Sequence, residues 1–222
     1  MLKFKAPRIF HLPWSQVVSK DDKFIKSTTV FRDKEVVVSL KLDGENISLY
    51  NDGSFHAKSL DSKQHDSRDW LYSWWANRLY TDTYVMVIHN KWPELRLVGE
   101  NMFATHTIKY NNLEDLFILH SVWNGTTCLS WKDTLKISYA LNIKTAPVLF
   151  EGVYDELAIR KLDCLEKYRD DLVEGYVVRN SDVYSYKDSL NNIAKFVSNR
   201  FNITSGDDWM HCSITKNKVN EI

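Results

Sequence analysis

Lys41-Leu42-Asp43-Gly44-Glu45-Asn46 places a lysine two residues before an Asp-Gly pair, directly after the apolar run at 36–40. This order predicts a lysine at the end of a buried strand, with a tight turn just beyond it. A free lysine amine has a pKa of about 10.4 and is a poor nucleophile at neutral pH, but partial burial and neighbouring cations favour the neutral, nucleophilic amine. The competing interpretation is a strand, a turn and a solvated lysine, because so short a pattern also arises by chance.

Five further segments follow Lys41 in an informative order. They are His56–Ser62, Val98–Phe103, Phe117–Trp123, Glu174–Arg179 and Ala194–Val197. With KLDGEN, this series resembles the covalent nucleotidyltransferase superfamily, which contains ATP-dependent polynucleotide ligases and capping guanylyltransferases. Within it, the chain looks most like a small ATP-dependent RNA ligase, on the details KLDGEN, HAKSLDS, GENMFATHTIKY and KFVSNRF…DDWM. The resemblance extends over most of the chain, from Pro7 to Met210.

The composition is that of an ordinary globular protein. The chain has 222 residues, 44% of them hydrophobic and 26% charged, and its formal net charge is zero. This length allows one large or two small domains. A net charge of zero argues against a strongly basic nucleic-acid coat protein, but it leaves room for a basic groove assembled by folding.

Three cysteines, Cys128, Cys164 and Cys212, lie far apart and form neither a C-x-x-C pair nor a zinc spacing. We interpret them as small core residues in a reducing compartment. No apolar stretch approaches the ~18 residues of a membrane span, and the first residues lack the apolar core of a signal peptide. We therefore expect a cytoplasmic protein that does not contact a membrane.

Short runs of β-branched and aromatic residues between turn formers predict eight strands. The expected strands are 36–42, 46–50, 54–58, 95–100, 117–123, 146–150, 173–179 and 193–198, with a hairpin turn at 51–53. Apolar residues at helical spacing predict helices over 67–80, 132–142 and 154–168. Trp70, Trp74 and Trp75 are expected in the core.

Strands grouped between separate helices predict an α+β fold with largely antiparallel sheets. The resemblance implies the nucleotidyltransferase fold, in which two sheets with flanking helices enclose a nucleotide cleft. We expect a single domain over 1–222, because too few residues follow Lys195 for a second domain of ligase type.

The resemblance implies a three-step reaction. Lys41 attacks the α-phosphate of ATP to give lysyl-AMP and pyrophosphate, AMP passes to a 5′-phosphate, and a 3′-hydroxyl then displaces AMP. Asp43 and Gly44 belong to the same motif and are expected to contact the nucleotide. Positioning and charge neutralisation supply most of the barrier reduction in such chemistry. The implied cofactors are ATP and Mg²⁺ or Mn²⁺, and the implied partner is a nucleic-acid end or nick, joined by a monomer.

Two residues are expected near the nucleotide sugar. Lys58 stands where family members commonly carry arginine, so the charge is kept and the bidentate fork is lost. Its competing interpretation is an exposed strand lysine. Glu100 follows Gly99 at the end of an apolar strand, where a carboxylate can accept from ribose hydroxyls. Its competing interpretation is a surface acid.

Phe117 and Glu174 are assigned to the base and to the metal. Phe117 is expected to stack on the purine, which is worth ~1–3 kcal/mol for an aromatic ring on a base. Core packing is the alternative, and Phe103 competes for a contact nearby. Glu174, before Gly175, is expected to bind the metal or a metal-bound water.

Lys195 is expected to contact the α-phosphate and to lower the pKa of Lys41 by like-charge repulsion. Many superfamily members carry a second lysine two residues later, where this chain has Val197. Arg200 is a candidate for the missing pyrophosphate contact. His120 is expected in a hydrogen-bonded structural role, and Arg8 and His11 either line the cleft or anchor the N-terminal segment.

Three other functions compete with an ATP-dependent RNA ligase. A GTP-dependent capping enzyme would share the lysine chemistry, although GENMFATHTIKY favours a ligase. A catalytically idle protein that binds nucleic-acid ends is disfavoured by the intact set of Lys41, Glu100, Glu174 and Lys195. A DNA-nick ligase stays open, because contacts to the 2′-hydroxyl cannot be identified in the sequence.

Overall fold

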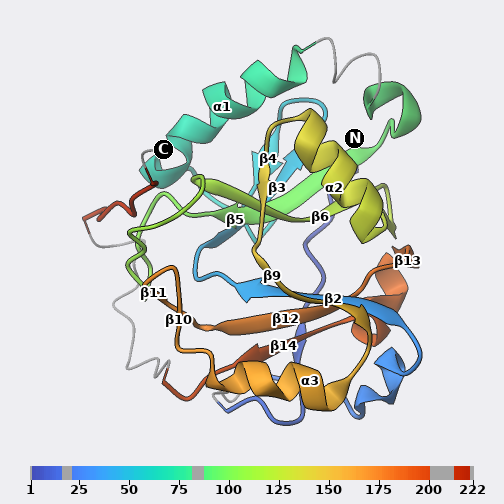
Figure 1. Cartoon of the computed structure of the whole chain (residues 1–222). Coiled ribbons are helices and arrows are strands. Elements are labelled where there is room, and N and C mark those ends of the chain that lie inside the picture. The colour runs from blue at the N-terminus through green and yellow to red at the C-terminus, as the bar shows by residue number, and fades with distance from the viewer. Residues whose placement is uncertain (1, 17–21, 82–87, 201–212, 221–222) are drawn as a thin grey trace.

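Two β-sheets lie face to face, and helices cover their outer sides (Figure 1). The structure is a computed structural model that describes residues 2–16, 22–81, 88–200 and 213–220. All eight expected strands are present, and nearly all pairings are antiparallel, so the α+β prediction is confirmed. The strands are β1 (Phe10–His11), β2 (Glu35–Lys41), β3 (Glu45–Tyr50), β4 (Phe55–His56), β5 (Leu95–Asn101), β6 (Phe117–Asn124), β7 (Thr127–Cys128), β8 (Lys144–Thr145), β9 (Val148–Val153), β10 (Lys167–Tyr168), β11 (Asp171–Leu172), β12 (Gly175–Asn180), β13 (Tyr184–Ser185) and β14 (Ile193–Val197).

The five-stranded sheet has the order β1-β14-β12-β2-β9. Alternate residues of a strand face opposite sides, and Val36, Val38, Tyr176 and Val178 belong to the cluster on its outer side. Ile159 of α3 (Glu156–Arg160) packs into the same cluster. The residues that alternate with these along β2 and β12 face the second sheet.

The second sheet has the order β13-β7-β6-β5-β3-β4, with β8 parallel to β6. Its outer face packs against α1 (Asp69–Leu79) and α2 (Trp131–Ala140). Leu71, Trp75 and Leu79 repeat at helical spacing and are buried there, while Trp70 and Trp74 pack against the same cluster. This confirms the first two predicted helices and the core placement of the tryptophans.

The third predicted helix, 154–168, is wrong in its length. Asp155 caps α3, the chain continues as the 3-10 helix η4 (Lys161–Cys164), and the β10–β11 hairpin follows. Arg169 and Asp170 form the turn of this hairpin with positive φ. Three more 3-10 helices are η1 (Thr28–Phe31), η2 (Asp66–Arg68) and η5 (Tyr186–Asn191).

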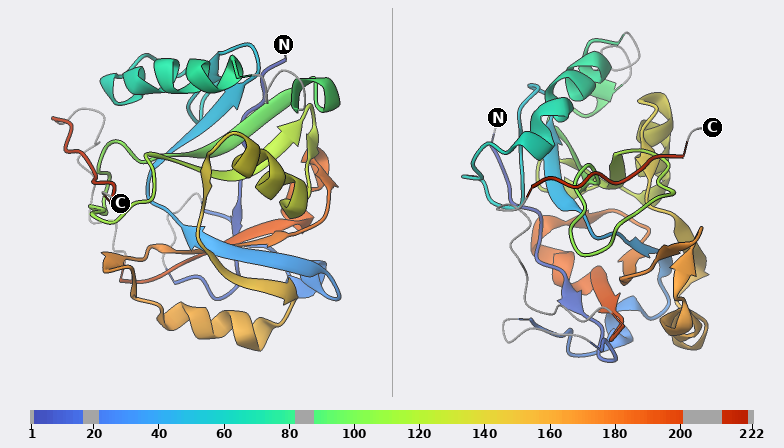
Figure 2. Two further views of the ribbon diagram at one scale, coloured as in Figure 1. Left: turned by 45° about the horizontal axis from the view of Figure 1, so that its top comes forward. Right: turned by 90° about the vertical axis from the view of Figure 1, so that its left-hand side faces the viewer.

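One predicted turn is present at 51–53, and the C-terminal segment 213–220 is held by hydrogen bonds. The 51–53 turn is confirmed, with Gly53 at φ +83° and a hydrogen bond from the amide of Tyr50 to the carbonyl of Ser54. Residues 213–220 run beside the loop that follows β5 (Figure 2). Buried Asn217 joins them, because its side chain bonds the backbone of Met102 and Tyr110. The DDWM motif lies outside the described residues.

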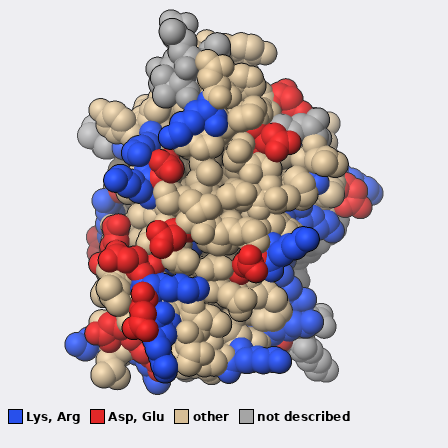
Figure 3. Space-filling model, turned by 90° about the vertical axis from the view of Figure 1, so that its right-hand side faces the viewer, with Lys and Arg blue, Asp and Glu red and all other residues tan. Residues whose placement is uncertain are grey.

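The surface charges agree with the composition, whereas the cysteines agree with the prediction only in part. Acidic and basic side chains are interspersed on the face in Figure 3, as a net charge of zero suggests. Cys128 is a buried free thiol, but Cys164 is exposed, so the core prediction fails there; Cys212 lies outside the described residues. Among the described residues, no helix is both long enough and apolar enough to cross a bilayer.

Candidate active site

Lys41 is the last residue of β2, where the chain leaves the five-stranded sheet for β3 of the other sheet. Its Nζ lies 2.5 Å from both carboxylate oxygens of Glu174. Glu174 directly precedes β12 and is buried, while the Lys41 side chain is 23% exposed. The sequence therefore placed both residues correctly at strand ends, and the structure brings them together.

Two glycines allow the backbones around Lys41 to come close. Gly175 lies opposite Lys41, and a Cβ on it would collide with the carbonyl oxygen of Phe196 on β14. A Cβ on Gly44 would lie 2.5 Å from Met102 Sδ and 3.0 Å from the carbonyl oxygen of Asn101 on β5. Glycine at these positions lets β14 and β5 approach the two motifs that carry Glu174 and Lys41.

Lys195 lies on β14, two strands from Lys41, and faces the second sheet. Burial lowers its pKa, and repulsion from Lys41 lowers it further. Burial also acts to lower the pKa of Lys41, but the Glu174 carboxylate outweighs it, and the pKa of Lys41 stands above its ordinary value. The pKa of Lys41 is raised overall because a carboxylate in contact acts more strongly than a cation two strands away, and a lowering contribution from Lys195 stays a prediction.

A polar group on the second sheet faces these lysines. Glu100 of β5 pairs in register with Asn46 of β3, whose amide nitrogen lies 3.4 Å from Glu100 Oε1. His120 of β6 approaches both, with Nε2 3.1 Å from Asn46 Nδ2 and 3.4 Å from Glu100 Oε1. Burial lowers the pKa of His120, so its hydrogen-bonded role is confirmed and its ring is neutral at pH 7.

Lys58 and Asp43 lie at the margin of this group. Lys58 is exposed just beyond β4, and its charge contributes to the lowered pKa of Lys195. The Asp43 carboxylate accepts hydrogen bonds from the amides of Thr107 and Ile108, each at 2.8 Å. Asp43 thus anchors the loop that follows β5, a role that sequence analysis did not predict.

The base-stacking interpretation of Phe117 needs correction. Its ring is 0% exposed and contacts Trp74 at a centroid distance of 5.2 Å, on the outer side of the sheet. Glu100 lies opposite Ile118 in the register, so Ile118 occupies the inner face and Phe117 faces the core. The competing candidate, Phe103, packs against Trp70 and lies under the ammonium of Lys216.

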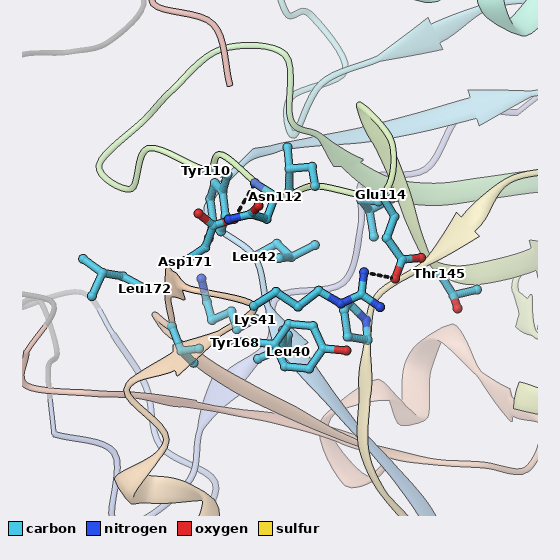
Figure 4. Close-up of a pocket in the computed structure, with 15 residues that line it drawn as sticks. Leu40, Lys41, Leu42, Tyr110, Asn112, Glu114, Thr145, Tyr168, Asp171 and Leu172 are labelled. Atoms are coloured by element: carbon cyan, nitrogen blue, oxygen red, sulfur yellow. Dashed lines mark hydrogen bonds and ion pairs between the residues drawn. The ribbon is translucent and has the colours of Figure 1, made fainter. Parts of the chain in front are cut away.

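A small pocket opens beside Lys41, between the ends of the two sheets (Figure 4). Leu40, Leu42 and Ile118 give it apolar walls, and Thr145 adds a hydroxyl. The β10–β11 hairpin closes one side, where Arg169 pairs with Glu114 at 2.5 Å and the Asp171 carboxylate accepts the amides of Asn111 and Asn112 at 2.9 Å. The pocket thus has an apolar interior and a polar rim next to Lys41.

The site offers few groups to a metal or to further phosphates. Within the described ranges, no three His, Cys, Asp or Glu side chains form a metal-binding cluster. A single carboxylate such as Glu174 still fits Mg²⁺, which is usually held by one or two carboxylates together with substrate phosphates. Val197 is buried, and Arg200 pairs with Glu166 at 3.4 Å.

Sequence reasoning missed two residues of the site. Asn46 ends the KLDGEN motif, and only the register between β3 and β5 reveals that it meets Glu100. Asp22 lies 3.8 Å from Lys195 Nζ through its Oδ1. No pattern in the sequence singles out Asp22, because a loop brings it there.

Comparison with known proteins agrees with this geometry. Residues 34–197 match the model of the RNA ligase family. No curated protein matched the sequence. The similar solved structures include a Naegleria gruberi RNA ligase mutant with ATP and Mn, which has 16% identity, a TM-score of 0.54, and coverage of 88% of this chain and 62% of that one.

Two further structures of the Naegleria gruberi RNA ligase show the same similarity. A mutant with AMP and Mn has 17% identity and a TM-score of 0.54, with 90% and 63% of the chains covered. The ligase with PPi has 16% identity and a TM-score of 0.53, also with 90% and 63% covered. The present chain spans about three fifths of the length of these ligases, and identities this low establish a shared fold. Because the family match includes most of the chain, the protein belongs to the RNA ligase family.

Proposed function

We propose that this protein is an ATP-dependent RNA ligase that joins 5′-phosphate and 3′-hydroxyl ends through a lysyl-AMP intermediate. The observation that carries the proposal is the contact between Lys41 and Glu174, beside Lys195 and opposite Glu100. Membership of the RNA ligase family supports the choice of reaction. The 222 residues would act as one nucleotidyltransferase domain with that superfamily's fold, as a monomer.

In the first step, the neutral Lys41 Nζ forms a bond to the α-phosphorus of ATP and the bond from that phosphorus to pyrophosphate breaks. The nitrogen releases one of its two protons to solvent and keeps the other as the N–H of lysyl-AMP. The amine must be neutral to attack, yet Glu174 holds it as an ammonium. A bound Mg²⁺ or Mn²⁺ would neutralise phosphate charge, and Glu174 would hold it together with phosphate oxygens. If Glu174 held the metal, its negative charge would stabilise the Lys41 ammonium less. The pKa of Lys41 would therefore fall.

The two sheets would hold different parts of ATP. Lys195 would neutralise the α-phosphate, and Lys58, whose charge acts on Lys195, would contact sugar or phosphate. Glu100 and Asn46 are placed to bond the ribose hydroxyls. The pocket beside Lys41 has the apolar walls that a purine requires, so we assign the base to Ile118, Leu40 and Leu42 in place of Phe117.

The nucleic acid reacts in the second and third steps, after pyrophosphate has left. A strand with a 5′-phosphate accepts AMP from Lys41, and the 3′-hydroxyl of the adjacent strand then attacks that phosphate and releases AMP. We place RNA at the 3′-hydroxyl side. The free thiols of Cys128 and Cys164 fit the reducing cytoplasm as the site of action.

The test begins with ATP labelled at its α-phosphate, incubated with the protein and Mg²⁺ and analysed on a denaturing gel. A covalent band with ATP and none with GTP is expected; a band with GTP alone would point to a capping enzyme. No band with either nucleotide would leave a protein that only binds ends. Nicked duplexes with RNA or DNA at the 3′-hydroxyl side then distinguish an RNA ligase from a DNA ligase, since equal joining would contradict the RNA assignment.

A further inference from the structure

His11 lies beside Lys195 in the five-stranded sheet. β1 runs parallel to β14, with His11 in register with Lys195, and the amide of Leu12 donates to the carbonyl of Lys195 at 2.7 Å. Residues paired in register project to the same face of a sheet, so His11 faces the cleft with Lys195. His11 is 1% exposed, and its Nε2 makes no well-aligned hydrogen bond; Asp22 Oδ1 lies 3.4 Å from it.

Ser15 fixes the tautomer of His11. The Ser15 hydroxyl accepts a hydrogen bond from the amide of Val197 at 2.9 Å and lies 2.7 Å from His11 Nδ1. The hydroxyl can donate to the Val197 carbonyl at 3.5 Å or to Nδ1 at 2.7 Å; the shorter separation, together with the Asp22 carboxylate oxygen 3.4 Å from Nε2, favours donation to Nδ1. Nδ1 is then an acceptor, and Nε2 carries the proton as a donor. Burial, with repulsion from Lys195, lowers the pKa of His11, so this neutral tautomer is the form present at pH 7.

An anionic oxygen already sits between His11 and Lys195. Asp22 Oδ1 lies 3.4 Å from His11 Nε2 and 3.8 Å from Lys195 Nζ. This oxygen is close to both groups and too far for a short hydrogen bond to either. The Asp22 side chain is 26% exposed, so the position of this oxygen is open to solvent. The arrangement marks a position where a phosphate oxygen would meet two donors.

The order of the strands shows which phosphate this is. Neighbouring strands lie ~4.8 Å apart, and Lys41, Lys195 and His11 stand on β2, β14 and β1, at increasing distance across the sheet. In an in-line displacement the leaving group departs on the side opposite the attacking atom. With Lys41 attacking and Lys195 at the α-phosphate, the phosphates beyond the α-phosphate extend toward His11.

We infer that His11 donates from Nε2 to the pyrophosphate portion of ATP, beside Lys195, and stabilises pyrophosphate as it leaves. This assignment rests on the proposed ATP-dependent adenylylation. It gives the site a polar contact for the leaving group although position 197 is a buried valine and Arg200 pairs with Glu166. His11 is then needed in the step that releases pyrophosphate and not in the step that seals an already adenylylated strand.

The test compares His11→Ala with His11→Gln, whose amide nitrogen lies about where Nε2 does. We expect His11→Ala to slow adenylylation by ATP about ten- to a hundred-fold, in line with a lost hydrogen bond to a charged group. His11→Gln should stay within about threefold of the unmodified protein. Both variants should seal pre-adenylylated RNA at the original rate. Equal slowing of both steps, unchanged adenylylation, or failure of glutamine to rescue would overturn the assignment.

A binding measurement separates this inference from the proposed function. Inorganic pyrophosphate with Mg²⁺ is titrated into the unmodified protein and both variants by calorimetry. Weaker binding by His11→Ala, with binding kept by His11→Gln, supports the contact even if no covalent adduct forms with ATP. Equal binding by all three proteins contradicts it even if adenylylation is robust.

Discussion

The two inner sheet faces of this protein differ in the chemistry they present to each other. The five-stranded sheet contributes Lys41, Lys195 and His11, which are cations or hydrogen-bond donors. The seven-stranded sheet contributes Glu100 and Asn46, which offer acceptors and a neutral amide. A nucleotide has a phosphate end that needs donors and a sugar that needs acceptors. We therefore expect substitutions in the five-stranded sheet to change mainly the rate of adenylylation, and substitutions in the seven-stranded sheet to change mainly the affinity for ATP.

The largest expected effect is on the nucleophile. Lys41→Ala should abolish the covalent adduct with ATP, because no other amine forms the bond to the α-phosphate. Thermal unfolding should remain cooperative but shift to a lower temperature, since the buried Glu174 carboxylate loses its partner. Lys58→Ala serves as the matched control, because it removes an exposed lysine near the same cleft and should keep the adduct. Labelling of Lys41→Ala together with loss of labelling in Lys58→Ala would show that the nucleophile has been misassigned.

Glu174 tests the charge coupling within the first sheet. Glu174→Gln should slow adenylylation by ~10²–10³-fold, the usual cost of losing a group aimed at transition-state charge. A rate near that of the unmodified protein at all Mg²⁺ concentrations would make Glu174 structural.

The same variant should change the titration of Lys41. The carboxylate raises the pKa of Lys41, so its removal should lower that pKa and make the amine reactive at lower pH. Reaction with an amine-selective reagent, followed by peptide mass spectrometry across a pH series, measures this shift. An onset of Lys41 reactivity that stays at the same pH in Glu174→Gln would contradict the coupling.

The sequence predicted this first sheet better than it predicted the second. Lys41 and Glu174 could be located because each sits in a short motif at a strand end, and Lys195 because it sits within a short apolar strand motif, where neighbours in sequence fix the local geometry. Phe117 was misassigned by one residue, because a one-residue change of register exchanges the two faces of a strand. The helix at 154–168 was too long, since its apolar spacing continued past Cys164 while the chain turned into the β10–β11 hairpin. Asp22 and Asn46 depend on contacts between distant segments, which periodicity does not encode.

A smaller effect is expected from the second sheet. Glu100→Gln should raise the KM for ATP about ten-fold and leave kcat within about threefold, because hydrogen bonds to a charged acceptor are worth ~1.5–3 kcal/mol and the sugar does not react. Steady-state adenylylation at varied ATP measures both constants. A loss confined to kcat would place Glu100 among the groups that act on the reacting phosphate, and the division between the sheets would fail.

The smallest expected effects come from two neighbours on opposite faces of β6. Phe117→Leu should lower the free energy of unfolding by ~1–2 kcal/mol, because it removes part of a fully buried ring, and it should leave the KM for ATP unchanged. Ile118→Ala should cost ~2–5 kcal/mol in the same measurement, because Ile118 is also buried, and should in addition raise the KM for ATP several-fold, because Ile118 lines the pocket beside Lys41. Urea unfolding and adenylylation kinetics on both variants separate these outcomes. If Phe117→Leu raised the KM and Ile118→Ala did not, the base would contact Phe117 after all, and the face assigned to the nucleotide would have to be exchanged.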